Sequence, residues 1–272
     1  MSSVRRRLDV ELVRRGLAPS RAQAQDLIEH GHVTVAGAPA DKAARLVAPA
    51  EAVAVRRSSP WASRGAEKLL GALTAFPELQ PSGRICLDAG AAAGGFTDVL
   101  LQRGAAAVCA VDVGYGQLAW RLRQDPRVVV LERVNVRHLT AEDVPAGLPG
   151  PVTLVVADLS FISLRLVLPA LASMASPGAD HLLLVKPQFE TGRDAVGKGG
   201  VVRDPRAWRQ ALLEVAEAGR AQGLRPAGAC CSPQPGPAGN VEFFWWFRAD
   251  GDVDAEAAAD AAVAEAEGAW RL

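Results

Sequence analysis

Short apolar runs alternate with helical patterns along most of the chain. Seven of these runs have the length and composition of buried strands, and apolar residues at helical spacing fill most of the gaps between them. The seven predicted strands are 85–87, 107–111, 128–131, 152–157, 181–185, 225–231 and 241–248. Because strands alternate with helices, we expect a mostly parallel sheet covered on both faces, with the last two strands antiparallel to each other.

The first of these runs leads into a glycine-rich bend, in the string ICLDAGAAAGGFT. The run ends at Asp88, and three alanines then lie between Gly90 and the pair Gly94 and Gly95. A glycine turn between a strand and a helix lets a nucleotide-like ligand lie against the backbone at the carboxyl edge of the sheet. The spacing differs from the dinucleotide fingerprint G-x-G-x-x-G, because position 92 is Ala, and this disfavours a nicotinamide dehydrogenase.

The second run adds an acidic residue to the same edge. It ends in Asp112, twenty-four residues after Asp88. A carboxylate at the end of the second strand can accept hydrogen bonds from both hydroxyls of a ribose. The predicted ligand is therefore a nucleoside without a pyrophosphate, and S-adenosylmethionine fits that description.

Charge is spread unevenly, although the formal net charge is zero. Residues 1–59 hold ten Arg and Lys against six Asp and Glu, and their pattern predicts two helices, small strands and a polar linker at the end. Residues 60–248 carry the α/β pattern, whereas residues 249–272 are rich in alanine and hold seven acids against one arginine. We therefore expect a head that binds a polyanion, an α/β domain and a solvated acidic tail.

Four ionisable residues are predicted to lie at one edge of the sheet. Asp158 and Lys186 follow the fourth and fifth strands, whose carboxyl ends meet where ligands bind in open α/β sheets. Glu242 begins the last strand, and an antiparallel strand would bring its start to the same edge. Lys68 lies in the helix before the sheet, and sequence alone does not place it. Each residue by itself is typical of a surface charge, but four together indicate a site.

The basic head resembles a known RNA-binding module. Its strings SRAQA and GHVTVAG are similar to those of the S4 module, in which the second helix and the following turn lie against structured RNA. The resemblance implies that the arginines contact phosphates, which supplies affinity without sequence reading. The alternative is that they only solvate a small domain. The RNA-binding residues expected in the head are Arg5, Arg6, Arg14, Ser20, Arg21 and Gln23.

The rest of the chain resembles the ribose 2′-O-methyltransferases of the FtsJ/RrmJ class, and with the S4 head it closely resembles the TlyA (hemolysin A) family of ribosomal RNA methyltransferases. The matching strings are SRGAEKL, LDAGAAAGGFTDVLLQRGA, VDVGYGQLAWRLRQDPRV, ADLSFISLRLVLPAL, LVKPQFETGR, VGKGGVVRDP and GNVEFFWW. They extend over nearly the whole chain apart from the acidic tail. The resemblance implies a Rossmann-like, seven-stranded α/β methyltransferase sheet after a small α+β S4 domain. It also implies S-adenosylmethionine as cofactor, ribosomal RNA or ribosomal subunits as partners, and a cytidine ribose as acceptor.

The resemblance further implies roles for the four edge residues. Lys186 would act as a base or as a stabiliser of the oxyanion when the 2′-hydroxyl attacks the methyl group. Lys68, Asp158 and Glu242 would orient Lys186 and contribute to the electric field around it. Much of the rate is expected from alignment of the hydroxyl, the methyl group and the sulfur.

Cofactor contacts are implied in the same way. The expected cofactor-binding residues are Gly90, Gly94, Gly95 and Phe96 at the methionine side, Asp112 at the ribose, Asn135 at the adenine and Asp158 near the methyl donor. The family loop usually carries a small hydroxyl residue where Ala92 or Ala93 stands here, and its loss could weaken one cofactor contact.

A second glycine-rich stretch, GRDAVGKG at 192–199, nearly matches a phosphate-binding P-loop. Position 199 is Gly, so the hydroxyl that would bind a metal is missing. We interpret the stretch as a basic loop for substrate RNA, and a plain flexible loop is the alternative. The RNA-binding residues expected outside the head are Arg64, Arg193 and Lys198.

Several classes of protein are disfavoured. The four Cys and four His lack metal-ligand spacing, so we expect no metal. No apolar run approaches the roughly 20 residues of a membrane helix, and the start MSSVRRR lacks an apolar signal core. We therefore expect a cytoplasmic protein, monomeric or weakly dimeric and without a membrane partner. A cytolysin would need a lipid-facing pattern, and a non-catalytic ribosome-assembly factor would predict damaged edge residues, whereas all four are present.

Overall fold

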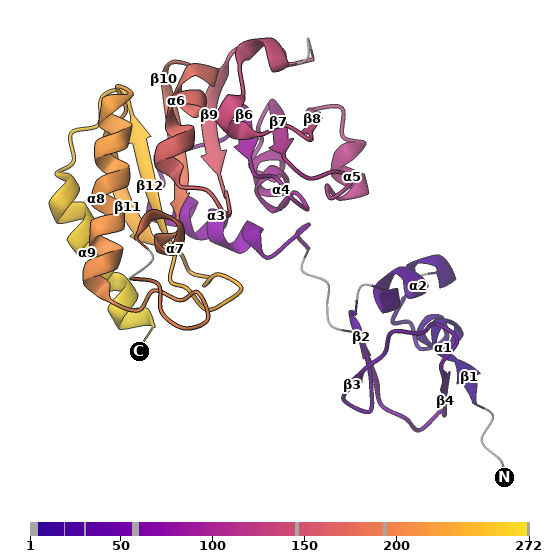
Figure 1. The fold of residues 1–272 in the computed structure, drawn as a ribbon. Helices are drawn as coiled ribbons and strands as arrows, with labels where there is room; N and C mark the ends of the chain where they lie inside the picture. The colour runs from indigo at the N-terminus through magenta and orange to yellow at the C-terminus, as the bar shows by residue number, and fades with distance from the viewer. Residues whose placement is uncertain are drawn as a thin grey trace. The chain divides into compact units, whose positions relative to one another are not determined.

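The computed structural model describes residues 5–18, 20–29, 31–55, 60–144, 147–192 and 195–270. The chain divides into two compact units, 1–60 and 61–272; Figure 1 colours the chain by residue number. The polar linker expected at the end of residues 1–59 falls on residues 56–59, which lie outside the described residues.

The first unit packs two helices with short antiparallel strands. Its elements are β1 (Arg6–Arg7), α1 (Leu8–Arg14), α2 (Arg21–Glu29), β2 (Val33–Val35), β3 (Ala38–Pro39), β4 (Leu46–Val47) and β5 (Val53–Val55). Strand β2 lies between β3 and β5, and β1 pairs with β4. The Ser20 hydroxyl accepts a hydrogen bond from the Gln23 amide and so caps α2, as its residue type predicts. Leu8, Leu12 and Ile28 from the two helices meet in a buried core.

The second unit is built on one seven-stranded sheet, in the order β11-β12-β10-β9-β6-β7-β8. Its strands are β6 (Ile85–Ala89), β7 (Ala107–Asp112), β8 (Val128–Glu132), β9 (Val152–Ala157), β10 (Ala175–Val185), β11 (Arg225–Cys231) and β12 (Phe243–Arg248). The predicted strands are all present, and β10 begins six residues earlier than expected. Strand β12 is antiparallel to both of its neighbours, which confirms the predicted antiparallel final pair.

Helices cover both faces of this sheet (Figure 1). They are α3 (Gly65–Ala75), α4 (Gly95–Gln102), α5 (Trp120–Arg123), α6 (Leu164–Met174), α7 (Pro187–Glu190), α8 (Pro205–Ala221) and α9 (Ala255–Ala269), with 3-10 turns η1 (Val136–His138) and η2 (Ala141–Asp143). Alternate strand residues face opposite layers: Leu154 and Val156 pack with α3 and α4, whereas Val155 packs with α6 and α8. Among the described residues, no helix has the length and apolar character to cross a membrane.

The expectation of a solvated acidic tail is wrong for residues 255–269. This stretch forms α9, and its alanine face is buried against β11 and α8. The Glu265 carboxylate accepts a hydrogen bond from the backbone amide of Cys231, in the outermost strand of the sheet. Arg209 of α8 pairs with Glu256 and Asp260 on the outer side of the helix. The net charge suggested a tail, but alanines at helical spacing let the helix lie close to an otherwise open sheet edge.

The packing of α9 can be tested with one substitution at two positions. Ala259 is fully buried and Ala264, in the same helix, is exposed. Ala259→Asp places an unpaired charge in the core and should lower the free energy of unfolding by about 2 kcal/mol or more. Ala264→Asp should cost about 1 kcal/mol or less, from helix propensity and its spacing to Asp260. Urea unfolding of both variants measures the difference, and equal effects would contradict a packed α9.

Candidate active site

The bend between β6 and α4 requires glycine at two positions. Gly90 and Gly94 have φ values of 84° and 94°, in the left-handed region. An added Cβ at Gly90 would lie 2.5 Å from the carbonyl oxygen of Asp158, and one at Gly94 would overlap the side chain of Leu122. Ala92 also has a positive φ, 46°, although it is not glycine. The bend is therefore held in one shape by close packing on both sides.

A buried carboxyl group lies beneath this bend. Asp88, at the end of β6, accepts hydrogen bonds on Oδ2 from the Thr97 amide (2.8 Å) and the Thr97 hydroxyl (2.6 Å). Its Oδ1 is buried and has no hydrogen-bond partner among the described residues. Burial raises the pKa of Asp88 to about 7, although the Thr97 hydrogen bonds oppose the shift.

Asp112, the last residue of the neighbouring strand β7, stabilises the bend by hydrogen bonds. Its Oδ2 accepts from the Ala92 amide (2.8 Å), and its Oδ1 accepts from the Gly114 amide (2.6 Å). The side chain is only partly buried. Each carboxylate oxygen can accept more than one hydrogen bond, so Asp112 retains acceptor capacity for a hydroxyl-bearing ligand.

The structure brings the four predicted edge residues together in one network, which we call the tetrad: Lys68, Asp158, Lys186 and Glu242. Lys68 Nζ of α3 lies 2.6 Å from Glu242 Oε2, just before β12, and 3.7 Å from Asp158 Oδ2, just after β9. Asp158 Oδ1 lies 2.6 Å from Lys186 Nζ, just after β10. Two ammonium groups alternate with two carboxylates, so the charges of the network balance, which offsets part of the cost of burying them.

Within the tetrad, Lys186 points toward a residue that sequence reasoning missed. Its Nζ donates a hydrogen bond to the hydroxyl of Ser160 (2.8 Å) and pairs with Asp158, while its side chain is largely buried. A lysine ammonium has three donors, and these described contacts use two. One donor direction thus remains for an incoming oxygen atom. The spacing Asp158-Leu159-Ser160 places the hydroxyl two residues after Asp158 and three after the last residue of β9, and this spacing was the available signal.

Glu242 is the most deeply buried member of the tetrad. Its side chain is 1% exposed, and its Oε1 has no partner in the part of the chain that the structure describes. Burial raises the pKa of the Glu242 carboxyl, while the ammonium groups of Lys68 and Lys186 oppose the shift. Gly236 lies against it, since an added Cβ there would be 2.5 Å from Oε1. The loop before β12 therefore fits closely over this carboxylate.

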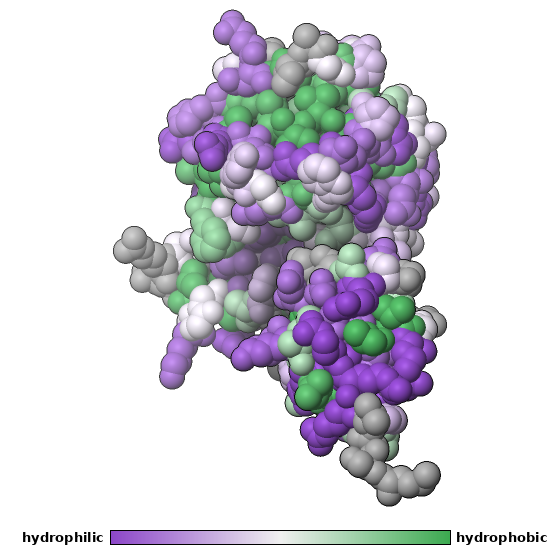
Figure 2. All heavy atoms as spheres, turned by 90° about the vertical axis from the view of Figure 1, so that its right-hand side faces the viewer, coloured by the Kyte–Doolittle hydropathy of each residue, from purple (hydrophilic) through white to green (hydrophobic). Residues whose placement is uncertain are grey.

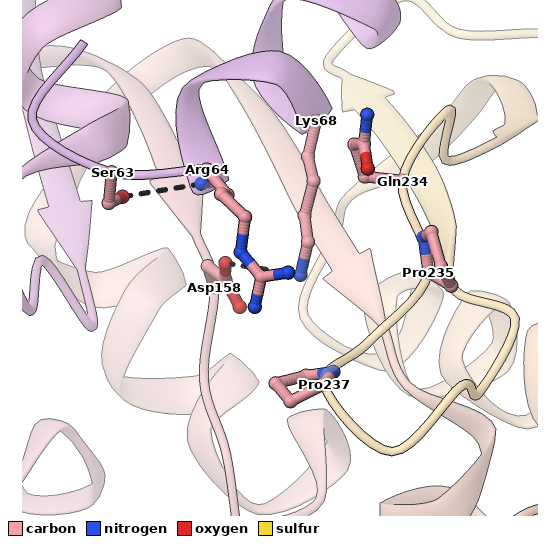
Figure 3. Close-up of a pocket in the computed structure, with 8 residues that line it drawn as sticks. Ser63, Arg64, Lys68, Asp158, Gln234, Pro235 and Pro237 are labelled. Atoms are coloured by element: carbon pink, nitrogen blue, oxygen red, sulfur yellow. Dashed lines mark hydrogen bonds and ion pairs between the residues drawn. The ribbon is translucent and has the colours of Figure 1, made fainter. Parts of the chain in front are cut away.

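A cavity of about 220 Å³ opens beside the tetrad (Figure 3). Its lining residues are Ser63, Arg64, Gly65, Lys68, Asp158, Gln234, Pro235 and Pro237. The Gln234 amide donates a hydrogen bond to Glu67 (2.6 Å), which ties the proline-rich loop to α3. Arg64, Lys68 and Asp158 thus share a small polar cavity between the start of α3 and the end of β9.

Other predicted residues lie apart from the tetrad or pack differently from expectation. Phe96 is 3% exposed and stacks on Phe244 in the core, so only its backbone can face the bend. Asn135 is exposed, and its Oδ1 accepts from the Arg137 amide at the start of η1. Lys198 is exposed, and Arg193 lies outside the described residues. The RNA-binding residues expected in the head all belong to the first unit.

Glu190 is a second residue that the sequence did not reveal. Glu190 is buried at the end of α7, the short helix that begins directly after Lys186. Its carboxylate accepts hydrogen bonds from the Leu164 amide (2.7 Å) and the Ser163 hydroxyl (2.5 Å). Burial raises the pKa of its carboxyl, against the effect of these hydrogen bonds. The contacts tie α7 to the start of α6 and so fix the segment that follows Lys186. No sequence pattern predicts this long-range pairing.

Comparison with known proteins matches both units. The family model of the S4 domain matches residues 6–53, and the family model of the FtsJ-like methyltransferase matches residues 61–249. The 16S/23S rRNA (cytidine-2′-O)-methyltransferase TlyA of Mycobacterium tuberculosis is 57% identical over 91% of either chain. Hemolysin A of Brachyspira hyodysenteriae is 35% identical over 89% of this chain and 99% of its own. A solved structure from Streptococcus thermophilus, provisionally named a hemolysin, has a TM-score of 0.75 at 36% identity and covers 99% of this chain and 98% of its own.

The shifted pKa of Asp88 predicts a pH dependence of stability. The folded protein keeps the Asp88 proton up to about pH 7, whereas the unfolded chain loses it near its ordinary value of 3.8. The contribution of this group is therefore fully present below about pH 4 and is lost as pH rises through about 7, with a slope of up to about 1.4 kcal/mol per pH unit. Asp88→Asn should remove this slope.

Urea unfolding between about pH 4 and pH 8 measures the effect. Relative to Asp88→Asn, the wild type should lose stability as pH rises through this range. Asp252→Asn changes an exposed acid of the same unit and should follow the wild type. Parallel curves for the wild type and Asp88→Asn would show that Asp88 is ionised in the folded protein throughout.

Proposed function

The chain belongs to the TlyA family of FtsJ-like methyltransferases with an S4 domain, and we propose that it transfers a methyl group from S-adenosylmethionine to a ribose 2′-hydroxyl of ribosomal RNA. The observation that carries the proposal is the continuous tetrad beside the glycine bend, at the edge where open α/β sheets bind ligands. A methyl acceptor placed there would meet the free donor direction of Lys186.

The residues of the bend suit S-adenosylmethionine. Gly94 and Gly95 are buried against Leu122 and Ser63, so they shape the bend, whereas the partly exposed Gly90 and the exposed Ala92 leave backbone that the methionine end can approach. Asp112 has acceptor capacity for the ribose hydroxyls. The Asn135 side-chain amide nitrogen is free of described hydrogen bonds and can donate to the adenine edge. When bound, the cofactor supplies a methyl group already activated on a sulfonium.

The tetrad would act on the ribose hydroxyl. Asp158 and Ser160 hold Lys186 Nζ from two sides, so its third donor direction is fixed. As an ammonium, Lys186 would donate a hydrogen bond in this direction and stabilise the charge that develops on the oxygen. Only as a neutral amine would its lone pair there take up the proton of the hydroxyl. Glu242 anchors Lys68, which adds a second positive charge near the reacting oxygen. We assign the central role to Lys186 and positioning roles to the other three.

RNA binding is assigned to residues 1–59 and catalysis to residues 60–248. The S4 match and the exposed arginines of the first unit support the first assignment. Arg64 at the cavity and the exposed Lys198 are proposed to contact the substrate near the tetrad. The acceptor is proposed to be a cytidine ribose, as the name of the M. tuberculosis relative states for that protein. The remaining residues, 249–272, would support the sheet through α9 rather than act as a tail.

A non-catalytic RNA-binding factor is the alternative. Such a protein has no need for two lysines and two carboxylates that meet in one network. These residues come from three different strand termini and one helix. Buried charges are costly unless they are paired, so an unused tetrad would be expected to decay. The intact network therefore favours an enzyme.

Removal of the Lys186 ammonium tests the proposal. Lys186→Met keeps most of the side-chain volume and should reduce methyl transfer to ribosomal subunits by about 100-fold or more. S-adenosylmethionine binding, measured by calorimetry, should change little, because the bend is untouched. Arg225→Ala removes an exposed cation of the same unit and should leave both properties unchanged.

The readout is transfer of labelled methyl groups, with the modified nucleotide located by mapping 2′-O-methyl positions in the RNA. Full activity of Lys186→Met would remove Lys186 from the centre of the reaction. No 2′-O-methylation by the wild type on ribosomal RNA or either subunit would reject the proposed function and favour the non-catalytic alternative.

A further inference from the structure

Two acidic side chains are buried in the basic first unit. Asp9 and Glu11, both in α1, have side chains that are 0% and 1% exposed. Acidic residues are rarely fully buried unless they are paired. In a unit proposed to bind a polyanion, they also carry the wrong sign of charge, so they call for an explanation.

Asp9 is held by two arginines and an amide. Arg7 Nε lies 3.1 Å from Asp9 Oδ1 and Arg7 Nη2 lies 3.2 Å from Asp9 Oδ2, so the contact is bidentate. Arg21 Nη2 and Gln25 Nε2, both from α2, each lie 2.9 Å from Oδ2. Burial raises the pKa of Asp9, but these hydrogen bonds outweigh it and hold the pKa below its ordinary value. One carboxylate thus fixes arginines from two segments of the unit.

Glu11 plays the same part on another side of α1. Its Oε1 lies 2.6 Å from Arg14 Nη2 and 2.7 Å from Arg15 Nε, and its Oε2 lies 2.8 Å from Arg14 Nε. Arg6 Nη1 approaches Oε2 at 4.0 Å. The contacts with Arg14 lower the pKa of Glu11 to about 2, against the effect of burial. Glu11 is therefore ionised at neutral pH and holds a second group of arginines.

The arginines remain accessible while they are held. We define the arginine face as the exposed side chains of Arg7 and Arg21, which Asp9 holds, and of Arg14, which Glu11 holds on another side of α1; they are 44%, 58% and 48% exposed. A guanidinium has five donors, and the contacts with Asp9 and Glu11 leave some of them directed to solvent. The visible surface of the first unit is mostly hydrophilic (Figure 2). A free arginine loses much side-chain freedom on binding, whereas a held arginine has already lost it.

We propose that Asp9 and Glu11 are positioning residues that hold the arginine face as a preformed array for the phosphates of structured RNA. This rests on the proposed RNA-binding function of the first unit and deepens it. The two acids touch no RNA in this account. They act by fixing the guanidinium groups that do, so that binding does not have to order each long side chain separately.

The sign of one affinity change separates this proposal from simple electrostatics. If only net charge matters, removal of an acid makes the unit more basic and should tighten RNA binding. If positioning matters, Asp9→Asn and Glu11→Gln should each weaken binding by about fivefold, because released arginines must be ordered on binding. Asp41→Asn removes one charge from an exposed acid of the same unit and should leave binding equal or slightly tighter.

The experiment measures the affinity of the full-length protein for a fluorescent RNA hairpin at several salt concentrations. A hairpin suffices because phosphate contacts do not depend on sequence. Arg21→Ala is measured beside the acidic variants and should weaken binding and reduce the salt slope by about one. Thermal unfolding confirms that each variant is folded. If Asp9→Asn unfolds the first unit, Glu11→Gln decides, because Glu11 holds different arginines and leaves the contacts of Asp9 in place.

The outcomes separate RNA binding by the arginine face from the positioning role of Asp9 and Glu11. An unchanged affinity and salt slope for Arg21→Ala would reject RNA binding by the arginine face, and so the proposed role of this unit. A weakened Arg21→Ala together with folded acidic variants that bind as tightly as Asp41→Asn, or more tightly, would overturn the positioning role alone. Weaker binding by the folded acidic variants, against a neutral or tighter Asp41→Asn, supports it.

Discussion

The pairing of buried charges in the tetrad is the constraint on which the catalytic unit depends. Lys68 and Glu242 are almost inaccessible, and Asp158 links them to Lys186. Removing any one partner would leave an uncompensated charge in a region of low polarity. The ends of β9 and β10, the start of β12 and the helix α3 must therefore stay in register. The antiparallel insertion of β12 between β10 and β11 is what brings Glu242 to the edge where the parallel strands end.

The same physical rule operates in both units. In the catalytic unit, carboxylates hold Lys68 and Lys186, and Lys68 lines a small cavity. In the first unit, Asp9 and Glu11 hold arginines whose guanidinium groups remain accessible. In each case a carboxylate fixes a flexible cation before a ligand arrives, which reduces the ordering that binding requires. The glycine bend follows a related logic, since close packing at Gly90 and Gly94 fixes its backbone.

The sequence predicted most of the features that depend on local pattern. The seven strands, the glycine bend and three of the tetrad residues at strand ends follow from apolar periodicity and the position of charges after apolar runs. Lys68 and Glu190 could not be placed in this way, because their contacts join segments far apart in the chain. Helix α9 was misjudged because composition emphasised its charge, whereas its burial depends on alanine spacing and on an open sheet edge. Ser160 could have been found from its spacing to Asp158, but a lone serine carries little information without the Lys186 contact.

The central claim is that the methyl donor lies on the glycine bend with its sulfur directed toward the tetrad. A crystal structure of the protein with S-adenosylhomocysteine bound tests this most directly. The account predicts the ribose hydroxyls on Asp112 and the sulfur facing the gap between the bend and Lys186 Nζ. A ligand bound elsewhere, or a sulfur that faces away from Lys186 and Asp158, would contradict it.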